Sequence, residues 1–344
     1  MKTILLHVLS ELQESRSASG AVHIIKGKRS AQTIQDIQLF HLSKWAGAAR
    51  FWKGTDPSAL AEELFNQQLI TGAGRRAALT NKGFEQLKQA EWLQQLYFQG
   101  REYEWNGFAE AFWRKLNLTV QAAGSLASKN KGFLPVYAEA EERDAVRKII
   151  KSAGSRHVNR LLYNKLEGEL SLLSERSADI FVSRLAGNAS QGKTVKQLAG
   201  RLSEEEVFLR WRSVLHWLMK SEWPAELQPL ISHIEKQKSR LTNSAEKTKR
   251  FVYEGKTKAE IAALRGLKSS TVEDHLVELA MFDPDFPAHN YISEKRLKDL
   301  SIILQSSDQQ ETLKELKEKA GDKGSYFDIR LAGALLKNRK GAES

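Results

Sequence analysis

Apolar residues along this chain recur mostly at spacings of three and four residues and rarely at every second position. Spacings of three and four place side chains on one face of a helix. Only six prolines interrupt the 344 residues, so long helices are possible. The main exception is residues 71–79, where a short alternating pattern predicts strands. We therefore predict an all-α, multi-domain protein with one small hairpin.

Two stretches suggest domain boundaries. Residues 124–135, GSLASKNKGFLP, are rich in glycine, serine and lysine, and residues 236–256 are strongly basic. Such stretches commonly separate compact domains. They predict an N-terminal helical, winged-helix-like domain (1–123), a helical middle domain (124–235) and a helix-turn-helix domain (236–344).

Residues 256–279 carry the clearest local pattern, which predicts two short helices at a tight turn. Thr257 is expected to cap the first helix, and Ser269 or Ser270 the second. Gly266 is expected at the break, because glycine adopts the left-handed conformation without a Cβ penalty. This order is typical of a helix-turn-helix.

Apolar positions in the two helices predict how they pack. The predicted apolar face of the first helix consists of Ile261, Ala262 and Leu264. The predicted core contacts of the second helix are Val272, Leu276 and Leu279.

Residues 256–279, together with Ser325–Leu336, resemble the helix-turn-helix domain at the C-terminus of RecQ-type helicases. The matching motifs are IAALRGL…STVEDHL and residues 326–331, YFDIRL. The whole chain is similar to the YpbB-type family of Firmicutes, in which such a domain stands in a protein separate from a RecQ-like helicase. The resemblance implies a DNA-associated partner of a helicase supplied by another chain.

The charge of the chain also favours a polyanionic partner. The net charge is +11 and the pI about 9.5. The tract 236–256 has seven basic and two acidic residues, hence seven minus two, or +5. A solvated helix face or a basic linker is an equally good interpretation of such a tract. The candidate phosphate contacts in and after it are Lys247, Lys249, Arg250, Lys256, Lys258, Arg265 and Lys268.

The second helix of the predicted motif has the opposite charge. Residues 269–293 contain no lysine or arginine, and the helix carries Glu273, Asp274 and Glu278. Phosphates repel carboxylates, and base reading usually depends on Arg, Lys, Asn or Gln. Two interpretations remain: cations contact phosphates without base reading, or the acidic face binds a basic protein such as a helicase.

Residues 58–87 resemble a winged helix. In that pattern a helix, within the segment 58–70, is followed by a short hairpin, whose strands would hold Leu69, Ile70, Ala77, Ala78 and Leu79. Thr80 is expected to cap the next helix. Arg75 and Arg76 at the hairpin tip are candidate DNA contacts, because arginine can engage phosphate with two hydrogen bonds. A surface turn without a ligand is the alternative.

Residues 187–194, GNASQGKT, match the literal phosphate-loop pattern GxxxxGK[ST]. That loop requires a buried strand before it, whereas the spacing in residues 178–186 predicts a helix. The triplet Gly-Lys-Thr recurs at residues 255–257, so Thr194 is predicted to be a helix N-cap. A nucleotide-binding ATPase is the alternative.

Several chemistries are not expected. Without cysteine there is no disulfide or thiolate metal site, and the eight histidines lack metal-ligand spacing. No catalytic constellation is evident, so we expect no enzyme activity, cofactor or small-molecule substrate. No apolar run approaches the ~20 residues of a membrane span. The N-terminus lacks a signal-peptide cleavage pattern, so the expected location is the cytoplasm, where association with the nucleoid is possible.

These observations favour a non-enzymatic DNA-associated accessory or adaptor protein. The resemblance implies cooperation with a RecQ-like DNA helicase in replication, recombination or repair. A helix-turn-helix transcriptional regulator, which would bind a discrete operator, is the alternative.

Overall fold

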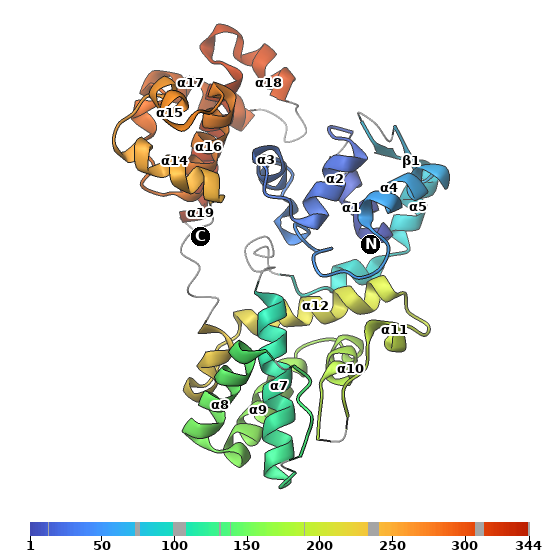
Figure 1. Cartoon of the computed structure of the whole chain (residues 1–344). Helices are drawn as coiled ribbons and strands as arrows, with labels where there is room; N and C mark the ends of the chain where they lie inside the picture. Colours follow the sequence, from blue (N-terminus) through green and yellow to red (C-terminus); the bar gives the residue numbers. More distant parts are fainter. Residues whose placement is uncertain are drawn as a thin grey trace. The chain divides into compact units, whose positions relative to one another are not determined.

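The computed structural model describes residues 1–12, 14–72, 76–98, 108–130, 132–137, 139–188, 190–232, 241–306 and 313–342. Helices dominate it, which confirms the predicted all-α class (Figure 1). Within these ranges the strands are β1 (Ile70–Thr71) and β2 (Ala78–Leu79). The described helices do not include one with the length and apolarity needed to cross a bilayer.

The chain folds into two compact units. The first comprises Met1–Lys28 and Leu42–Lys238, and the second comprises Arg29–His41 and Ser239–Ser344. Residues 29–41 therefore join the second unit although they interrupt the first in sequence, which the sequence pattern did not predict. All eight tryptophans of the chain belong to the first unit.

The α-helices of the first unit are α1 (Lys2–Leu12), α2 (Ala18–Lys26), α4 (Pro57–Asn66), α5 (Asn81–Lys88), α7 (Ala109–Ala127), α8 (Ala140–Ala153), α9 (Ser155–Leu170), α10 (Glu175–Arg184), α11 (Val195–Leu198) and α12 (Glu204–Lys220). Its 3-10 helices are η1 (Leu42–Lys44), η2 (Glu91–Gln95) and η3 (Ala225–Leu230). Helix α7 continues through residue 123, where the first domain boundary was placed.

The predicted hairpin lies between α4 and α5. Its strands pair antiparallel, with Ile70 opposite Leu79 and Thr71 opposite Ala78. Thr80 caps α5, because its Oγ1 accepts a hydrogen bond from Gly83 N at 3.1 Å. The predictions of the hairpin and of this cap are confirmed. The tip residues 73–75, Arg75 among them, lie outside the described residues.

The second unit contains α3 (Ala31–Leu39), α14 (Asn243–Tyr253), α15 (Lys258–Arg265), α16 (Ser269–Phe282), η4 (Ala288–Asn290), α17 (Glu294–Ser306), α18 (Leu313–Ala320), η5 (Gly321–Lys323) and α19 (Tyr326–Ala342). Its core gathers apolar side chains from α14, α15, α16 and α19. Helix α16 is central, because α14, α15, α19 and α3 all pack on it.

Candidate nucleic-acid interface

Helix α15 and the turn after it form as the sequence predicts. Thr257 Oγ1 accepts from Glu260 N, and the Glu260 carboxylate accepts from Thr257 N at 2.8 Å, which closes a capping box. Gly266 ends α15 in the left-handed conformation with φ +61°. The predicted cap at Thr257 and the predicted turn at Gly266 are both confirmed.

The start of α16 differs from the prediction. Lys268 is the N-cap residue, with φ −69° and ψ 146°, and its carbonyl accepts from Thr271 N and Val272 N. Ser269 and Ser270 are consequently the first two helical residues, so the prediction that one of them caps α16 was wrong. The lysine side chain makes no capping hydrogen bond. The N-terminal amides of α16 therefore lack the side-chain acceptor that usually satisfies them.

Helix α16 is accessible only near its start. The predicted core residues Val272, Leu276 and Leu279 are fully buried, which confirms them. Every residue from His275 to Ala280 is buried, whereas Ser269 and Ser270 are exposed. A recognition helix needs an open face along several turns to lie in the major groove. In this structure the fully exposed residues of α16 are Ser269 and Ser270 in its first turn, and Glu273 and Asp274 of the next turn are only partly exposed.

The apolar face predicted for α15 is smaller than expected. Ile261 is fully buried and Ala262 half-buried, but Leu264 is 60% exposed. Leu264 therefore does not contribute to the core, because the helix turns it to the outside one residue before its last.

The carboxylates of α16 are bound inside the unit. Glu273 pairs with Lys258 of α15 at 2.8 Å, and Asp274 pairs with Arg330 of α19. Glu278 is 3% exposed and accepts from the backbone and side chain of Thr242, at the N-cap of α14. Because Glu278 is buried, it is not part of an exposed acidic face. Partner binding by Glu273 and Asp274 stays a prediction.

Burial raises the pKa of the Glu278 carboxyl, although the hydrogen bonds from Thr242 oppose this shift. The next carboxylate, Asp283, is bound by Lys249 at 2.9 Å and by the hydroxyl of Tyr253 at 3.0 Å. The acidic residues of this helix thus hold neighbouring helices on α16. They do not surround its exposed first turn with unpaired negative charge.

The structure separates the predicted DNA contacts into two groups. One group is occupied within the unit: Lys249 with Asp283, Arg250 with Glu254, Lys258 with Glu273, and Arg265 with Ser244 and Thr248. The other group, Lys247, Lys256 and Lys268, forms no ion pair within 4 Å among the described residues of the unit, although the charge of Lys256 acts on the nearby Glu260 carboxylate. These three lysines are the better candidates for phosphate contact.

Arg76 is exposed beside the hairpin of the first unit. Of the basic tract, Lys236, Lys238 and Arg240 lie outside the described residues.

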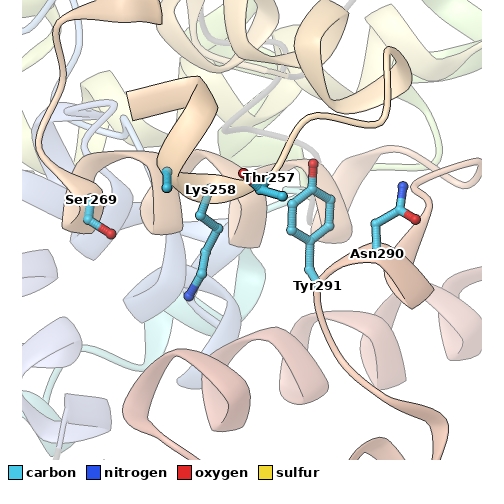
Figure 2. A pocket seen from close by; sticks show the side chains of 6 residues that line it. Thr257, Lys258, Ser269, Asn290 and Tyr291 are labelled. Carbon is cyan, nitrogen blue, oxygen red and sulfur yellow. The ribbon is translucent and has the colours of Figure 1, made fainter. Parts of the chain in front are cut away.

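A pocket of about 430 Å³ lies where α15 and α16 begin. Its lining residues are Thr257, Lys258 and Ala259 from the start of α15, Ser269 from the start of α16, and Asn290 and Tyr291 from η4 and the residue after it. Figure 2 shows Lys258 between Ser269 on one side and Tyr291 and Asn290 on the other.

The chemistry of this pocket suits an anion. Helix N-termini carry partial positive charge, and two of them meet here. The start of α15 is closed by its capping box, whereas the start of α16 has no side-chain cap and keeps its amide donors free. Lys256 directly precedes the Thr257 cap and Lys268 directly precedes Ser269. The Tyr291 hydroxyl donates to the Lys256 carbonyl at 2.8 Å and so ties η4 to the entry of α15. Asn290 and Tyr291 were not predicted, because only the tertiary fold brings them to the helix ends.

Arg265 was predicted to contact DNA, but its position indicates a structural role. Its guanidinium donates to the Ser244 carbonyl at 2.8 Å and to Thr248 Oγ1, and so ties α15 to α14.

We expect Arg265→Ala to lower the free energy of unfolding of the second unit by about 1.5–3 kcal/mol, as for lost hydrogen bonds of a charged group. Urea unfolding followed by far-UV circular dichroism measures this. The exposed Lys268→Ala is the control and should change stability by less than ~0.5 kcal/mol; equal effects would contradict the structural role.

His275 is predicted to make the second unit sensitive to acid. It is 7% exposed, and its Nδ1 lies 2.9 Å from Thr248 Oγ1. Burial, and then the charge of Arg265, lower the pKa of His275 below 6.5. The unfolded chain therefore binds a proton that the folded chain does not, so stability is lost as the pH falls below 6.5.

His275→Asn keeps a hydrogen-bond acceptor but cannot titrate. Its free energy of unfolding should fall less than that of the wild type between pH 7.5 and 5.5, in urea titrations followed by circular dichroism. His289→Asn, at an exposed position of the same unit, should keep the wild-type pH dependence. A wild-type pH dependence in His275→Asn would show that this residue is not the group responsible.

The phosphate-loop pattern has a helical setting. The element before it is α10, which confirms the predicted helix. Gly192 has φ +74°, and Thr194 caps α11 in a capping box with Gln197, as predicted. The Gly-Lys-Thr triplet at 255–257 has the same arrangement, with Gly255 at φ +75°. Both triplets are thus helix entry turns. The described residues contain no cluster of three or more His, Asp or Glu side chains able to hold a metal ion.

The trihelical arrangement of α14, α15 and α16, with its tight turn at Gly266, makes the second unit a helix-turn-helix domain, a class that suggests DNA binding. A family model described as a helix-turn-helix domain matches residues 244–333. Protein YpbB of Bacillus subtilis (strain 168) is 30% identical over 346 residues, which cover 96% of this chain and 95% of that protein. The chain therefore belongs to the YpbB family. No solved structure matches it significantly.

Proposed function

We propose that this protein is a non-enzymatic, DNA-associated accessory protein. It binds the DNA backbone through its helix-turn-helix unit, without reading base sequence, and works with a RecQ-like helicase supplied by another chain. The observation that carries this proposal is the burial of α16 from His275 to Ala280, which leaves Ser269 and Ser270 in its first turn as the exposed positions for DNA.

The first turn of α16 is suited to phosphate. Ser269 and Ser270 offer hydroxyl and amide donors, and Lys256 and Lys268 directly precede the lining residues Thr257 and Ser269 in sequence. Phosphate contacts position a protein on DNA, whereas base-edge contacts give specificity. The side chains that usually read bases, Arg, Lys, Asn and Gln, do not occur within α16. Binding of this kind is strongly salt-dependent and indifferent to sequence.

The support for a helicase partner is the resemblance of residues 256–279 and 325–336 to the C-terminal domain of RecQ-type helicases. The second of these segments forms the start of α19, whose Arg330 holds Asp274 of α16. Both matched segments therefore belong to one packed unit. A protein that carries this unit can deliver it to a helicase in trans.

The test is binding of the full chain to fluorescent single-stranded, duplex and forked DNA across a salt series, with and without the RecQ-like helicase. We expect sequence-indifferent binding that weakens with salt, and a gain in helicase activity or in DNA affinity when both proteins are present. Binding to DNA with no effect of either protein on the other would end the helicase part of the proposal. Preference for one discrete operator would instead favour a transcriptional regulator.

A further inference from the structure

A second basic segment belongs to the first unit, which does not contain the helix-turn-helix. Residues 145–166 contain six lysines and arginines and no aspartate or glutamate. Asp144 precedes this segment and Glu167 follows it. No other stretch between two consecutive carboxylates in the described part of the unit contains as many lysines and arginines.

The fold brings these cations together around one turn. The segment covers most of α8 and α9, which are joined at Gly154 with φ +76°. Both helices pack against α7 and against each other (Figure 1). Their apolar sides are buried through Val146 and Ile149 of α8 and through Val158, Leu162 and Leu166 of α9. The charged positions are therefore on the outer side of this helix pair.

Internal ion pairs account for only two of the six cations. Arg147 lies 3.3 Å from Asp144 and Lys165 lies 2.5 Å from Glu169. The remaining four, which we call the α8–α9 cations, are exposed and have no carboxylate partner among the described residues. They are Lys148, Lys151, Arg156 and Arg160.

Helix electrostatics do not explain all of this charge. Lys148 and Lys151 lie near the C-terminus of α8, where a cation is favourable. Arg156, however, lies in the first turn of α9, where the helix dipole opposes a positive charge. The N-cap of α9 is Gly154, which has no side chain to accept from the free amides. Positive charge at an uncapped helix start is unfavourable for the isolated fold and favourable for a bound anion.

An exposed aromatic side chain lies on the same helix as two of these cations. Tyr163 is 63% exposed and follows Arg156 and Arg160 at helical spacing, on the same face of α9. Its hydroxyl donates to Glu167 at 3.0 Å, which holds the ring in place. An exposed ring beside cations suits an unpaired base, which can stack on it while its phosphates meet the charges. Bases in a duplex are already stacked on each other, so they would not stack on the Tyr163 ring.

We propose that the α8–α9 cations and Tyr163 form a binding surface for single-stranded nucleic acid. This surface belongs to a different unit from the helix-turn-helix interface, and the proposal does not depend on the proposed function of that interface. The cations engage successive phosphates, and the Tyr163 ring stacks on a base.

The test uses the full chain carrying Lys247→Ala, Lys256→Ala and Lys268→Ala, so that the helix-turn-helix lysines cannot supply the contacts. Alanine at all four α8–α9 cations should weaken binding to fluorescent oligo(dT) at least about tenfold at low salt. The slope of log K against log salt should become shallower by roughly 3, at ~0.7 for each lost phosphate contact. A matched control replaces two lysines and two arginines at exposed positions of the same unit, Lys53, Arg176, Lys196 and Arg201, with alanine. The same loss in this control would overturn the proposal.

Three further variants make the test specific. Tyr163→Ala should weaken oligo(dT) binding several-fold and leave duplex binding unchanged, whereas Tyr163→Trp should restore it; no loss would overturn the proposal. Oligo(rU) run in parallel decides whether DNA or RNA binds more tightly. Arg156→Ala should not lower stability in urea unfolding followed by tryptophan fluorescence. Lower stability would indicate a structural role for this arginine and contradict its assignment to the surface.

Discussion

Gly192→Ala should destabilise the first unit much more than Gly255→Ala destabilises the second. Both glycines open a Gly-Lys-Thr entry turn at nearly the same positive φ, so both substitutions incur the left-handed strain of about 1–2 kcal/mol. A Cβ on Gly192 would also lie 2.2 Å from the Arg184 carbonyl oxygen, whereas nothing lies within 4 Å of one on Gly255. Relieving that clash requires backbone movement, which adds about 1–3 kcal/mol. The expected losses are therefore roughly 2–5 kcal/mol for Gly192→Ala and 1–2 kcal/mol for Gly255→Ala.

Because of the distribution of tryptophan, two spectroscopic signals can report the stability losses of the two glycine variants. All eight tryptophans lie in the first unit, so urea unfolding followed by tryptophan fluorescence reports Gly192→Ala. Far-UV circular dichroism reports both units and therefore includes Gly255→Ala. Equal losses at the two glycines would show that the contact with Arg184 is relieved without cost.

Alanine at Lys247, Lys256 and Lys268 should remove most of the phosphate contacts of the helix-turn-helix unit. These lysines form no ion pair within 4 Å among the described residues, and only Lys256 has a carboxylate, Glu260, near enough to interact with its charge. Most of their charge is therefore available to DNA. Each lost phosphate contact lowers the slope of log K against log salt by ~0.9 on duplex DNA. The triple variant should thus lose roughly 2–3 of that slope, and about 10- to 100-fold in affinity at low salt, equally on every duplex sequence.

The matched control changes three other exposed lysines of the same unit, Lys295, Lys298 and Lys314, to alanine. It removes the same net charge, so long-range attraction falls equally in both variants. Fluorescence anisotropy with labelled duplexes of unrelated sequence, across a salt series, distinguishes them. An equal loss in the control would mean that total charge, and not these three positions, determines binding.

The helix caps, the tight turn and the hairpin of this chain could be predicted from sequence because short-range interactions create them. The caps at Thr80, Thr194 and Thr257 depend on hydrogen bonds across three residues, and the turn at Gly266 depends on its own conformation. The hairpin between residues 70 and 79 is equally local. These elements were predicted correctly for that reason.

The sequence could not predict which charged side chains are paired within the fold, because their partners are distant in sequence. The acidic pattern of α16 suggested a face that repels phosphate or binds protein, yet Asp274 pairs with Arg330, 56 residues away. Glu278 reaches Thr242 across 36 residues. Arg265, counted among the DNA contacts, binds back to Ser244 across 21 residues. Composition states which charges exist, but only the tertiary fold decides which remain available to a ligand.

The inclusion of residues 29–41 in the second unit has a consequence for biosynthesis. Helix α3 leaves the ribosome early, but α16, on which it packs, follows only after residues 42–268 have been made. About 240 residues lie between the end of α3 and the end of α16, so at ~5–20 residues per second this interval lasts roughly 12–50 s. During this time Ile34 and Ile37, both buried in the finished protein, lack the helix that covers α3. The nascent chain should therefore be a chaperone client over this interval, and a stop codon before α16 should leave α3 exposed permanently.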